Sequence, residues 1–215
     1  MTKPEIIGSM RSTYTRAVCM LCEEKSIDYT LTEVGLGAPA LRAVHPFGKM
    51  PVLRHGDLAL FESAAIAGYL DRSFGGAKLF PAEPRGAALT EQWVSFVNTV
   101  VDRSFVRTYL YAYIATSDGK ADRAAIDRVM PEVRAQLAVL DKAVAKTGHL
   151  VDDIFTYADI NLLVILDPLK LAPEGAQALA DASNVDAYVA RHAMRASFVR
   201  TAPPPGPPRR VQPAS

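Results

Sequence analysis

Two groups of side chains near the N-terminus are suited to chemistry. Ser12, Thr13 and Tyr14 place three hydroxyls in succession, after a short strand pattern and at the start of a helical one. A hydroxyl at a helix start accepts a hydrogen bond from a free amide of the first turn, in the positive potential of the helix N-terminus. Further along the same helix, Cys19 and Cys22 form a Cys-x-x-Cys pair, a spacing that is typical of redox sites.

The position of the cysteine pair argues against redox chemistry. Reactive thiolates are stabilised at a helix N-terminus, and here that place is held by the hydroxyl residues. Cys19 and Cys22 fall about two turns into the helix, among apolar neighbours. We therefore interpret both cysteines as small apolar packing residues.

Composition and charge narrow the class of protein. Of 215 residues, 49% are apolar and 22% charged, which excludes a disordered or fibrous chain. The 24 basic and 23 acidic residues give a net charge of +1, so no charge excess is available for nucleic acid or an anionic membrane. Apolar runs are too short to span a bilayer, and the start carries no secretory signal. We expect a cytoplasmic protein without a metal, nucleic-acid or membrane partner.

The first part of the chain alternates strand and helix patterns, which predicts a small α/β unit with a mixed sheet. Its elements are expected in the order strand, helix, strand, helix, strand, strand, helix, at residues 5–8, 12–25, 28–34, 38–44, 50–54, 58–62 and 63–74.

The second part shows only helical patterns, at about residues 93–113, 126–144, 156–166, 175–182 and 185–194. Prolines discourage regular structure in the linker and in the tail. The predicted fold class is α/β plus all-α. The expected boundaries are 1–76 for the α/β domain, 77–86 for the linker, 87–201 for the helical domain and 202–215 for a proline-rich tail.

Short sequence motifs indicate one particular protein family. Residues His45–Leu53 (HPFGKMPVL) and Gly56–Ser63 (GDLALFES) resemble the glutathione-binding signature of the soluble glutathione S-transferases. Thr156–Ile160 (TYADI) resembles the helix-start motif of their helical domain. The stretch from Ser12 to Tyr29 is most similar to the phi class, with zeta-like features at its start. The resemblance implies a thioredoxin-like N-terminal domain, glutathione as co-substrate and a homodimer.

The resemblance also implies roles in glutathione binding. The Met50–Pro51 peptide bond is expected to be cis, which turns the backbone so that the amide and carbonyl of Val52 pair with the cysteinyl part of glutathione. Ser63 would hold the γ-glutamyl carboxylate at a helix N-terminus, while Glu62 would face the ligand's ammonium group. The residues alone allow simpler roles: Pro51 as an edge-strand proline, and Ser63 as a helix cap.

Ser12 is the candidate catalytic residue. Glutathione supplies the sulfur, so the enzyme must favour its thiolate, and a hydroxyl at the start of the first helix can donate a hydrogen bond to it. Tyr14 is the competing donor and Ser9 the third choice.

The residues available to bind the glycine carboxylate of glutathione differ from those of phi-class proteins. Phi-class proteins carry a basic pair upstream of the signature, and the matching stretch here is Leu36-Gly37. Lys49 and His45 are the remaining candidates, although His45 is equally well read as a loop residue.

In the helical domain, an aromatic cluster is expected to line the pocket that binds the electrophile. The predicted pocket residues are Phe105, Tyr109 and Tyr113, with Tyr14 from the N-terminal domain, although core packing would suit most of them as well. Thr156 and Asp159 predict a capping box, which we assign to folding.

The predicted function is conjugation of glutathione to small hydrophobic electrophiles. Two alternatives stay open: a glutathione-dependent, zeta-like isomerase, suggested by Arg11-Ser12, and a non-catalytic carrier of hydrophobic ligands. An isomerase would leave glutathione unconsumed, and a carrier would show no turnover.

Overall fold

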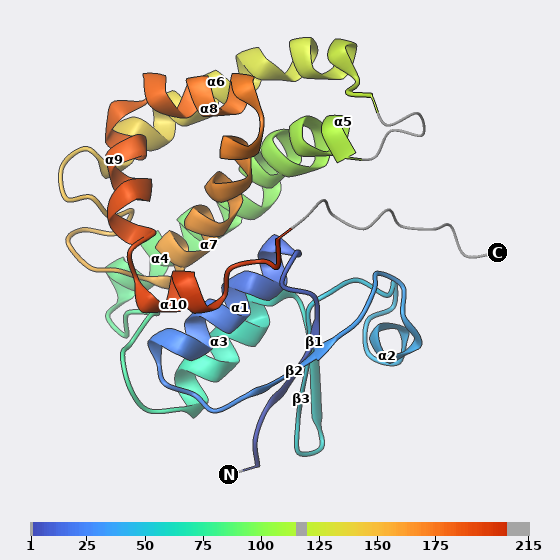
Figure 1. Cartoon of the computed structure of the whole chain (residues 1–215). Coiled ribbons are helices and arrows are strands. Elements are labelled where there is room, and N and C mark those ends of the chain that lie inside the picture. Colours follow the sequence, from blue (N-terminus) through green and yellow to red (C-terminus); the bar gives the residue numbers. More distant parts are fainter. Residues whose placement is uncertain (1, 115–119, 206–215) are drawn as a thin grey trace. The chain divides into compact units, whose positions relative to one another are not determined.

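The computed structural model describes residues 2–114 and 120–205, which form two compact units (Figure 1). One unit contains residues 2–80 together with the segment from 195 to 205, and the other contains the described residues of 81–194. Most of the predicted proline-rich tail, residues 206–215, lies outside the described residues.

The N-terminal unit is built on a four-stranded sheet in the order β2-β1-β3-β4. β1 pairs parallel with β2, and β3 pairs antiparallel with both β1 and β4. The strands and helices follow the predicted order, so the thioredoxin-like topology is confirmed. Their bounds are β1 Glu5–Gly8, α1 Thr13–Glu24, β2 Thr30–Glu33, α2 Pro39–Arg42, β3 Val52–His55, β4 Leu58–Phe61 and α3 Ser63–Ser73.

Helices cover both faces of this sheet (Figure 1). Successive side chains of a strand point to opposite faces, and both Ile6 and Ile7 of β1 are buried. Ile7 packs with Leu41 of α2 and Val52 of β3. Ile6 points to the other face, where α1 and α3 lie side by side. The double burial explains why β1 carries two adjacent apolar residues, Ile6 and Ile7, instead of alternating apolar and polar ones.

The C-terminal segment packs on α1, which differs from the boundary at residue 201 expected from the sequence. Arg195 donates two hydrogen bonds of 2.7 Å to the Glu24 carboxylate. The guanidinium of Arg16 lies 4.0 Å from the ring centre of Phe198 in α10 (Ala196–Arg200). Such pairing between residues far apart in the chain carries no sequence periodicity, so α10 was not predicted.

A buried ion pair joins the C-terminal end of α1 to α3. Lys25 Nζ lies 3.1 Å from Asp71 Oδ1, and the two side chains are 0% and 2% exposed. The same ammonium donates to the Ala77 carbonyl at 2.7 Å, and the carboxylate accepts from the Leu79 amide at 3.0 Å. Loss of one partner would leave a buried charge uncompensated, at a cost of about 3–5 kcal/mol.

The helical unit begins earlier than predicted. α4 spans Pro84–Phe96, and its N-cap residue Glu83 accepts hydrogen bonds from the Arg85 and Gly86 amides. Proline is tolerated in the first helical turn because its missing N–H has no intrahelical partner there. The end of the expected linker is therefore helical. The helix continues through two π-helical segments, Val97–Val101 and Arg103–Leu110, into α5, Tyr111–Ile114.

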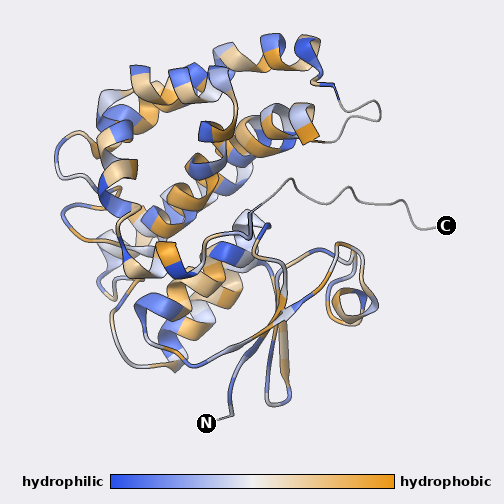
Figure 2. Cartoon of the chain, in the orientation of Figure 1, coloured by the Kyte–Doolittle hydropathy of each residue, from blue (hydrophilic) through white to orange (hydrophobic). Residues whose placement is uncertain are grey.

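The remaining helices confirm the predicted patterns, with short shifts at their ends. They are α6 Arg123–Val144, α7 Tyr157–Leu166, α8 Pro173–Asp181 and α9 Ser183–His192, with a 3₁₀ turn at Asp167–Leu171. Helices of this unit carry hydrophobic and hydrophilic residues on different sides (Figure 2). Every apolar position predicted for α6, from Ile126 to Val144, is buried.

The predicted capping box is present at the start of α7. The Thr156 hydroxyl accepts from the Ala158 amide at 3.2 Å, and the Asp159 carboxylate accepts from the Thr156 amide at 2.9 Å. Asp159 also accepts from the Leu150 amide and the Tyr188 hydroxyl. Burial raises the pKa of Asp159 to about 6. The motif therefore ties three segments of the helical unit together and has a structural role.

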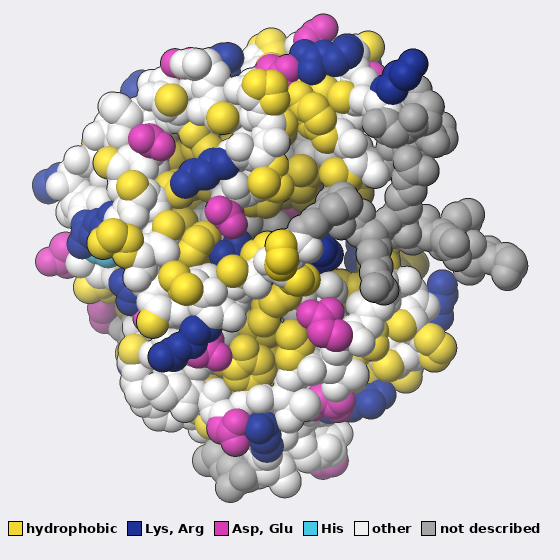
Figure 3. Space-filling model, in the orientation of Figure 1, with side chains coloured by type: hydrophobic (Ala, Val, Ile, Leu, Met, Phe, Trp, Pro, Cys, Tyr) yellow, Lys and Arg dark blue, Asp and Glu magenta, His cyan; other side chains and the backbone are white. Residues whose placement is uncertain are grey.

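The distribution of charged side chains on the surface is consistent with the near-zero net charge. On the face shown in Figure 3, acidic and basic side chains are interspersed among apolar ones. Across the described residues, no helix is both long enough and apolar enough to cross a membrane.

Candidate active site

Strand direction brings three predicted site segments to one edge of the sheet. β1 and β4 both run antiparallel to β3, so their C-terminal ends lie beside the start of β3. In this register Val52 is paired with both Ile7 and Phe61. The loop after β1 leads to Ser12, the loop before β3 contains Pro51, and β4 leads directly to Glu62. Residues distant in sequence therefore converge on one side of the N-terminal unit.

Ser12 is the N-cap residue of α1, with φ −83° and ψ 121°. Its Oγ accepts a hydrogen bond from the Thr15 amide at 3.3 Å, and its carbonyl accepts from the Arg16 amide at 2.9 Å. A hydroxyl that accepts in this way can still donate its own hydrogen. The half-buried Ser12 side chain thus suits a hydrogen bond to an anion at the helix N-terminus.

The competing hydroxyls have different surroundings. Tyr14 lies in the first turn of α1 and is also half-buried. Ser9 belongs to the turn before the helix, where its Oγ accepts from the Arg11 amide at 3.3 Å and its carbonyl accepts from the Ser12 amide. Tyr14 therefore remains the main alternative donor to Ser12.

Cys19 and Cys22 are fully buried in the middle of α1. Burial raises the pKa of the Cys19 thiol to about 12 and that of Cys22 well above its usual range. Burial therefore disfavours the thiolate, which is the nucleophilic form of cysteine. Their interpretation as packing residues is confirmed.

The Met50–Pro51 peptide bond is cis, as predicted. Val52, the expected backbone contact, is fully buried and lies inside the sheet between β1 and β4. Met50 is half-buried and precedes the strand, and its main chain has no hydrogen-bond partner among the described residues. Within the described part of the chain, the main-chain groups of Met50 are therefore unpaired beside the cis proline.

Glu62 occupies the N-cap position of α3, whereas Ser63 is the first helical residue. Glu62 has φ 69° and ψ 114°, a left-handed conformation that residues other than glycine adopt rarely, and its side chain makes no capping bond. Such strain costs about 1–3 kcal/mol and is common at binding sites. The reading of Ser63 as the cap is wrong, because the chain turns one residue earlier.

His45 lies in the loop before β3, as one of its two sequence interpretations expected, and its contact with the glycine carboxylate stays a prediction. The residue is 4% exposed. Its Nδ1 accepts from the Phe47 amide at 3.0 Å, and its Nε2 lies 3.8 Å from Glu62 Oε1. The ring is thus directed at an acidic side chain and enclosed by the protein.

Arg42 is a basic residue that sequence reasoning missed. Its Nε donates to the Gly37 carbonyl at 3.1 Å, and its side chain packs against Gly48, next to the exposed Lys49. A guanidinium therefore stands beside Leu36-Gly37, where the aligned basic pair is absent. The short helix α2 between Gly37 and Arg42 brings them together, and a basic residue in its last turn was the available signal.

Two family models match most of the chain. The model described as "Glutathione S-transferase, N-terminal domain" matches residues 6–78, and "Glutathione S-transferase, C-terminal domain" matches residues 100–196. Among curated relatives, glutathione S-transferase GstB of Escherichia coli is 32% identical over 160 residues, which covers 71% of this chain and 76% of GstB. The chain belongs to the soluble glutathione S-transferase family.

Solved structures agree. Glutathione transferase F7 from Populus trichocarpa aligns with a TM-score of 0.85 and 25% identity, over 93% of this chain and 97% of that one. A glutathione S-transferase from Methylobacillus flagellatus with glutathione bound aligns with a TM-score of 0.81 and 27% identity, over 94% and 100%.

The protein is thus a glutathione transferase of phi-like type, with glutathione as its co-substrate. The fold class and the enzyme class predicted from the sequence are confirmed. The comparisons do not favour the isomerase or the carrier.

Within the helical unit of this transferase, the predicted aromatic residues differ in exposure. Phe105 is 1% and Tyr109 0% exposed, whereas Tyr113 is half-buried. The Tyr109 hydroxyl accepts from the Gly175 amide at 2.7 Å and so holds the start of α8. Tyr109 therefore has a structural task whether or not it also serves the substrate.

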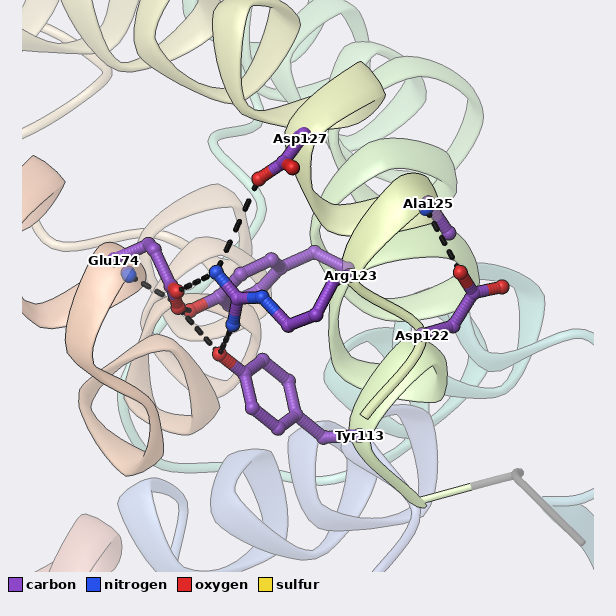
Figure 4. Close-up of polar contacts among 8 residues, drawn as sticks. Tyr113, Asp122, Arg123, Ala125, Asp127 and Glu174 are labelled. Atoms are coloured by element: carbon purple, nitrogen blue, oxygen red, sulfur yellow. Dashed lines mark hydrogen bonds and ion pairs between the residues drawn. The ribbon is translucent and has the colours of Figure 1, made fainter. Parts of the chain in front are cut away.

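Tyr113 belongs to a polar cluster with Arg123 and Glu174 (Figure 4). Its hydroxyl donates to Glu174 Oε2 and accepts from Arg123 Nη1 at 3.3 Å, while Arg123 Nη2 donates to Glu174 Oε1 at 2.6 Å. The hydrogen bond from Tyr113, together with Arg123, lowers the pKa of Glu174 to about 2. The cluster joins the end of α5 to the starts of α6 and α8.

The Glu174 carboxylate should make the stability of the transferase pH-dependent in acid. Its folded pKa of about 2 lies below the ordinary value of 4.5. Its contribution to the free energy of unfolding is therefore present above that ordinary value and is lost as the pH falls toward 2. In Glu174→Gln we expect a lower free energy of unfolding at neutral pH and a weaker decline in acid, measured by urea denaturation across a pH series.

The matched control for this experiment is Asp127→Asn. Asp127 is 76% exposed and lies 3.9 Å from the same arginine. Its replacement should leave the acid profile unchanged. An acid decline in Glu174→Gln as steep as in the unmodified protein would contradict the prediction.

Proposed function

We propose that this transferase binds glutathione along the edge of the sheet where β1, β3 and β4 meet, and conjugates its thiolate to small hydrophobic electrophiles. The observation that carries the proposal is the convergence, in one unit, of a helix-capping hydroxyl, an open main-chain segment before a cis proline and a strained helix start. Each of these three features has a counterpart in one part of the tripeptide.

The cysteinyl part pairs with the main chain next to Pro51. This contact was expected at Val52, and the pairing of Val52 within the sheet supports Met50 in its place. The γ-glutamyl carboxylate lies at the N-terminus of α3 against Ser63, where main-chain amides and the helix dipole favour an anion. The exposed Glu62 carboxylate receives the ammonium group of the same residue.

Ser12 acts on the sulfur. Its hydroxyl donates a hydrogen bond to the thiolate, and the N-terminus of α1 adds positive potential, so both lower the pKa of the bound thiol. The thiol proton leaves to solvent, and the thiolate attacks the electrophile, forming a carbon–sulfur bond as the leaving group departs. The gain in rate comes from ionisation and from holding the reactants together.

The assembly and location follow the family. We propose a cytoplasmic homodimer in which α3 packs against α4 of the partner. Sedimentation should therefore give about twice the chain mass of 23.3 kDa. Sedimentation at the chain mass at micromolar concentration would refute the dimer.

Arg42 supplies the missing anchor for the glycine carboxylate, with Lys49 beside it. The variant Arg42→Gln should weaken glutathione binding about tenfold, because a charge-assisted contact is lost. Binding of γ-glutamylcysteine, which has no glycine, should not change between the variant and the unmodified protein. Calorimetric titration of both peptides measures this, and equal losses for both would exclude the anchor.

The main test is Ser12→Ala, assayed for consumption of glutathione with a small aryl halide. We expect kcat/KM to fall about 10- to 100-fold, as when one donor to a reacting anion is removed. The pKa of bound thiol, followed by thiolate absorbance against pH, should rise by about one unit, or ~1.4 kcal/mol. The affinity for glutathione should change little.

Tyr14→Phe and Ser9→Ala serve as controls. Both should retain the thiol pKa and most of the activity. A raised thiol pKa in Tyr14→Phe, with Ser12→Ala unaffected, would assign the donor to Tyr14 instead.

A further inference from the structure

We propose that His45 is a positioning residue for glutathione, because it holds the Glu62 carboxylate where the ligand's ammonium group arrives. The proposal rests on the proposed role of Glu62 in binding that ammonium group. It gives His45 a task different from the glycine-carboxylate contact considered for it from the sequence.

The two ring nitrogens of His45 have separate partners. Nδ1 accepts the Phe47 amide hydrogen at 3.0 Å. A neutral imidazole carries one hydrogen, so it must then lie on Nε2. Nε2 lies 3.8 Å from Glu62 Oε1, longer than a direct hydrogen bond. The ring therefore presents its hydrogen-bearing nitrogen to the carboxylate.

The surroundings hold this ring in place. The ring centre of His45 lies 4.9 Å from that of Phe61 and 6.2 Å from that of Phe47. Its main chain is fixed as well, since its amide donates to the Leu41 carbonyl at 2.7 Å and its carbonyl accepts from the Gly48 amide at 2.9 Å. Among the described residues, Glu62 is the acidic residue whose carboxylate lies near a ring nitrogen of His45.

Glu62 by itself is poorly constrained. Its side chain is 71% exposed and makes no capping bond to α3. A long, exposed carboxylate loses rotamer freedom when it binds a ligand, and that loss weakens binding. A buried imidazole that already orients the carboxylate reduces the loss. His45 comes from the loop before β3 and Glu62 from the end of β4, so the contact also joins two of the segments that form the proposed site.

The test compares glutathione with its analogue that lacks the α-amino group, by calorimetric titration of the full-length protein. The unmodified protein should prefer glutathione. In His45→Asn, whose side-chain oxygen can still accept from the Phe47 amide but whose amide falls short of Glu62, glutathione should bind about 3- to 10-fold more weakly. Binding of the analogue should be nearly unchanged. In turnover, KM for glutathione should rise while kcat at saturation stays the same.

Two further variants separate positioning from a merely structural role. In a Glu62→Gln background, His45→Asn should cause no further loss, because the carboxylate that His45 positions for the ammonium group is already absent. His45→Gln, whose longer amide again reaches toward Glu62, should recover most of the affinity. Equal weakening of both ligands by His45→Asn, or the same loss in the Glu62→Gln background, would overturn the proposal.

A measurement on the unmodified side chain covers the case in which His45→Asn does not fold. Nitrogen NMR of the His45 ring should show hydrogen on Nε2, and glutathione should shift that resonance more than the analogue does. Glu62→Gln should abolish the difference, and an unaffected resonance would overturn the proposal. If the unmodified protein binds neither ligand, the proposed glutathione site itself is wrong; if Glu62→Gln removes the preference and His45→Asn does not, only the role of His45 is wrong.

Discussion

Strand direction in a small sheet is the constraint on which the proposed site depends. Because β3 runs antiparallel to both β1 and β4, its first residue lies beside the last residues of these two strands. The two strands then lead into α1 and α3, so two helix N-termini and the cis proline meet at one edge. Helix N-termini attract anions, and glutathione carries a carboxylate and a thiol that ionises to a thiolate. The pairing of β3 with β1 and β4 therefore brings together the main-chain groups and the positive electrostatic potential that the proposed glutathione site needs.

Close packing of α1 on β1 keeps this arrangement in place. A side chain at Gly8 would lie 2.5 Å from Thr15 Oγ1, so only glycine allows the helix to approach the strand so closely. Eight successive residues of α1 are buried, from Thr15 to Cys22. The C-terminal segment adds the Phe198 ring, which packs against the Arg16 guanidinium, and a two-point contact from Arg195 to Glu24. The cap residue Ser12 thus begins a helix that is held along its whole length.

Local sequence patterns predicted much of the secondary structure of this protein. Apolar spacing placed most helices and strands to within a few residues, because burial of one face repeats along an element, although it missed the start of α4 and the whole of α10. The capping box of Thr156 and Asp159 was readable, since both partners lie within one turn. The cis bond before Pro51 was predicted from a motif, and its position in the chain matches. The family itself could be assigned from two short motifs.

Only the tertiary structure decided which distant segments of the chain pair with one another. The sequence determined the order of elements, the hydroxyl at the first helix and the class of enzyme, since these follow from local spacing and from motifs. The structure decided that Val52 lies within the sheet, and that Glu62 and not Ser63 occupies the N-cap position of α3. It also decided that Arg42 lies beside Gly37, and that residues 195–205 pack with the first unit. These contacts depend on which backbone groups and charges come together after folding, and the periodicity of the sequence does not predict contacts between distant residues.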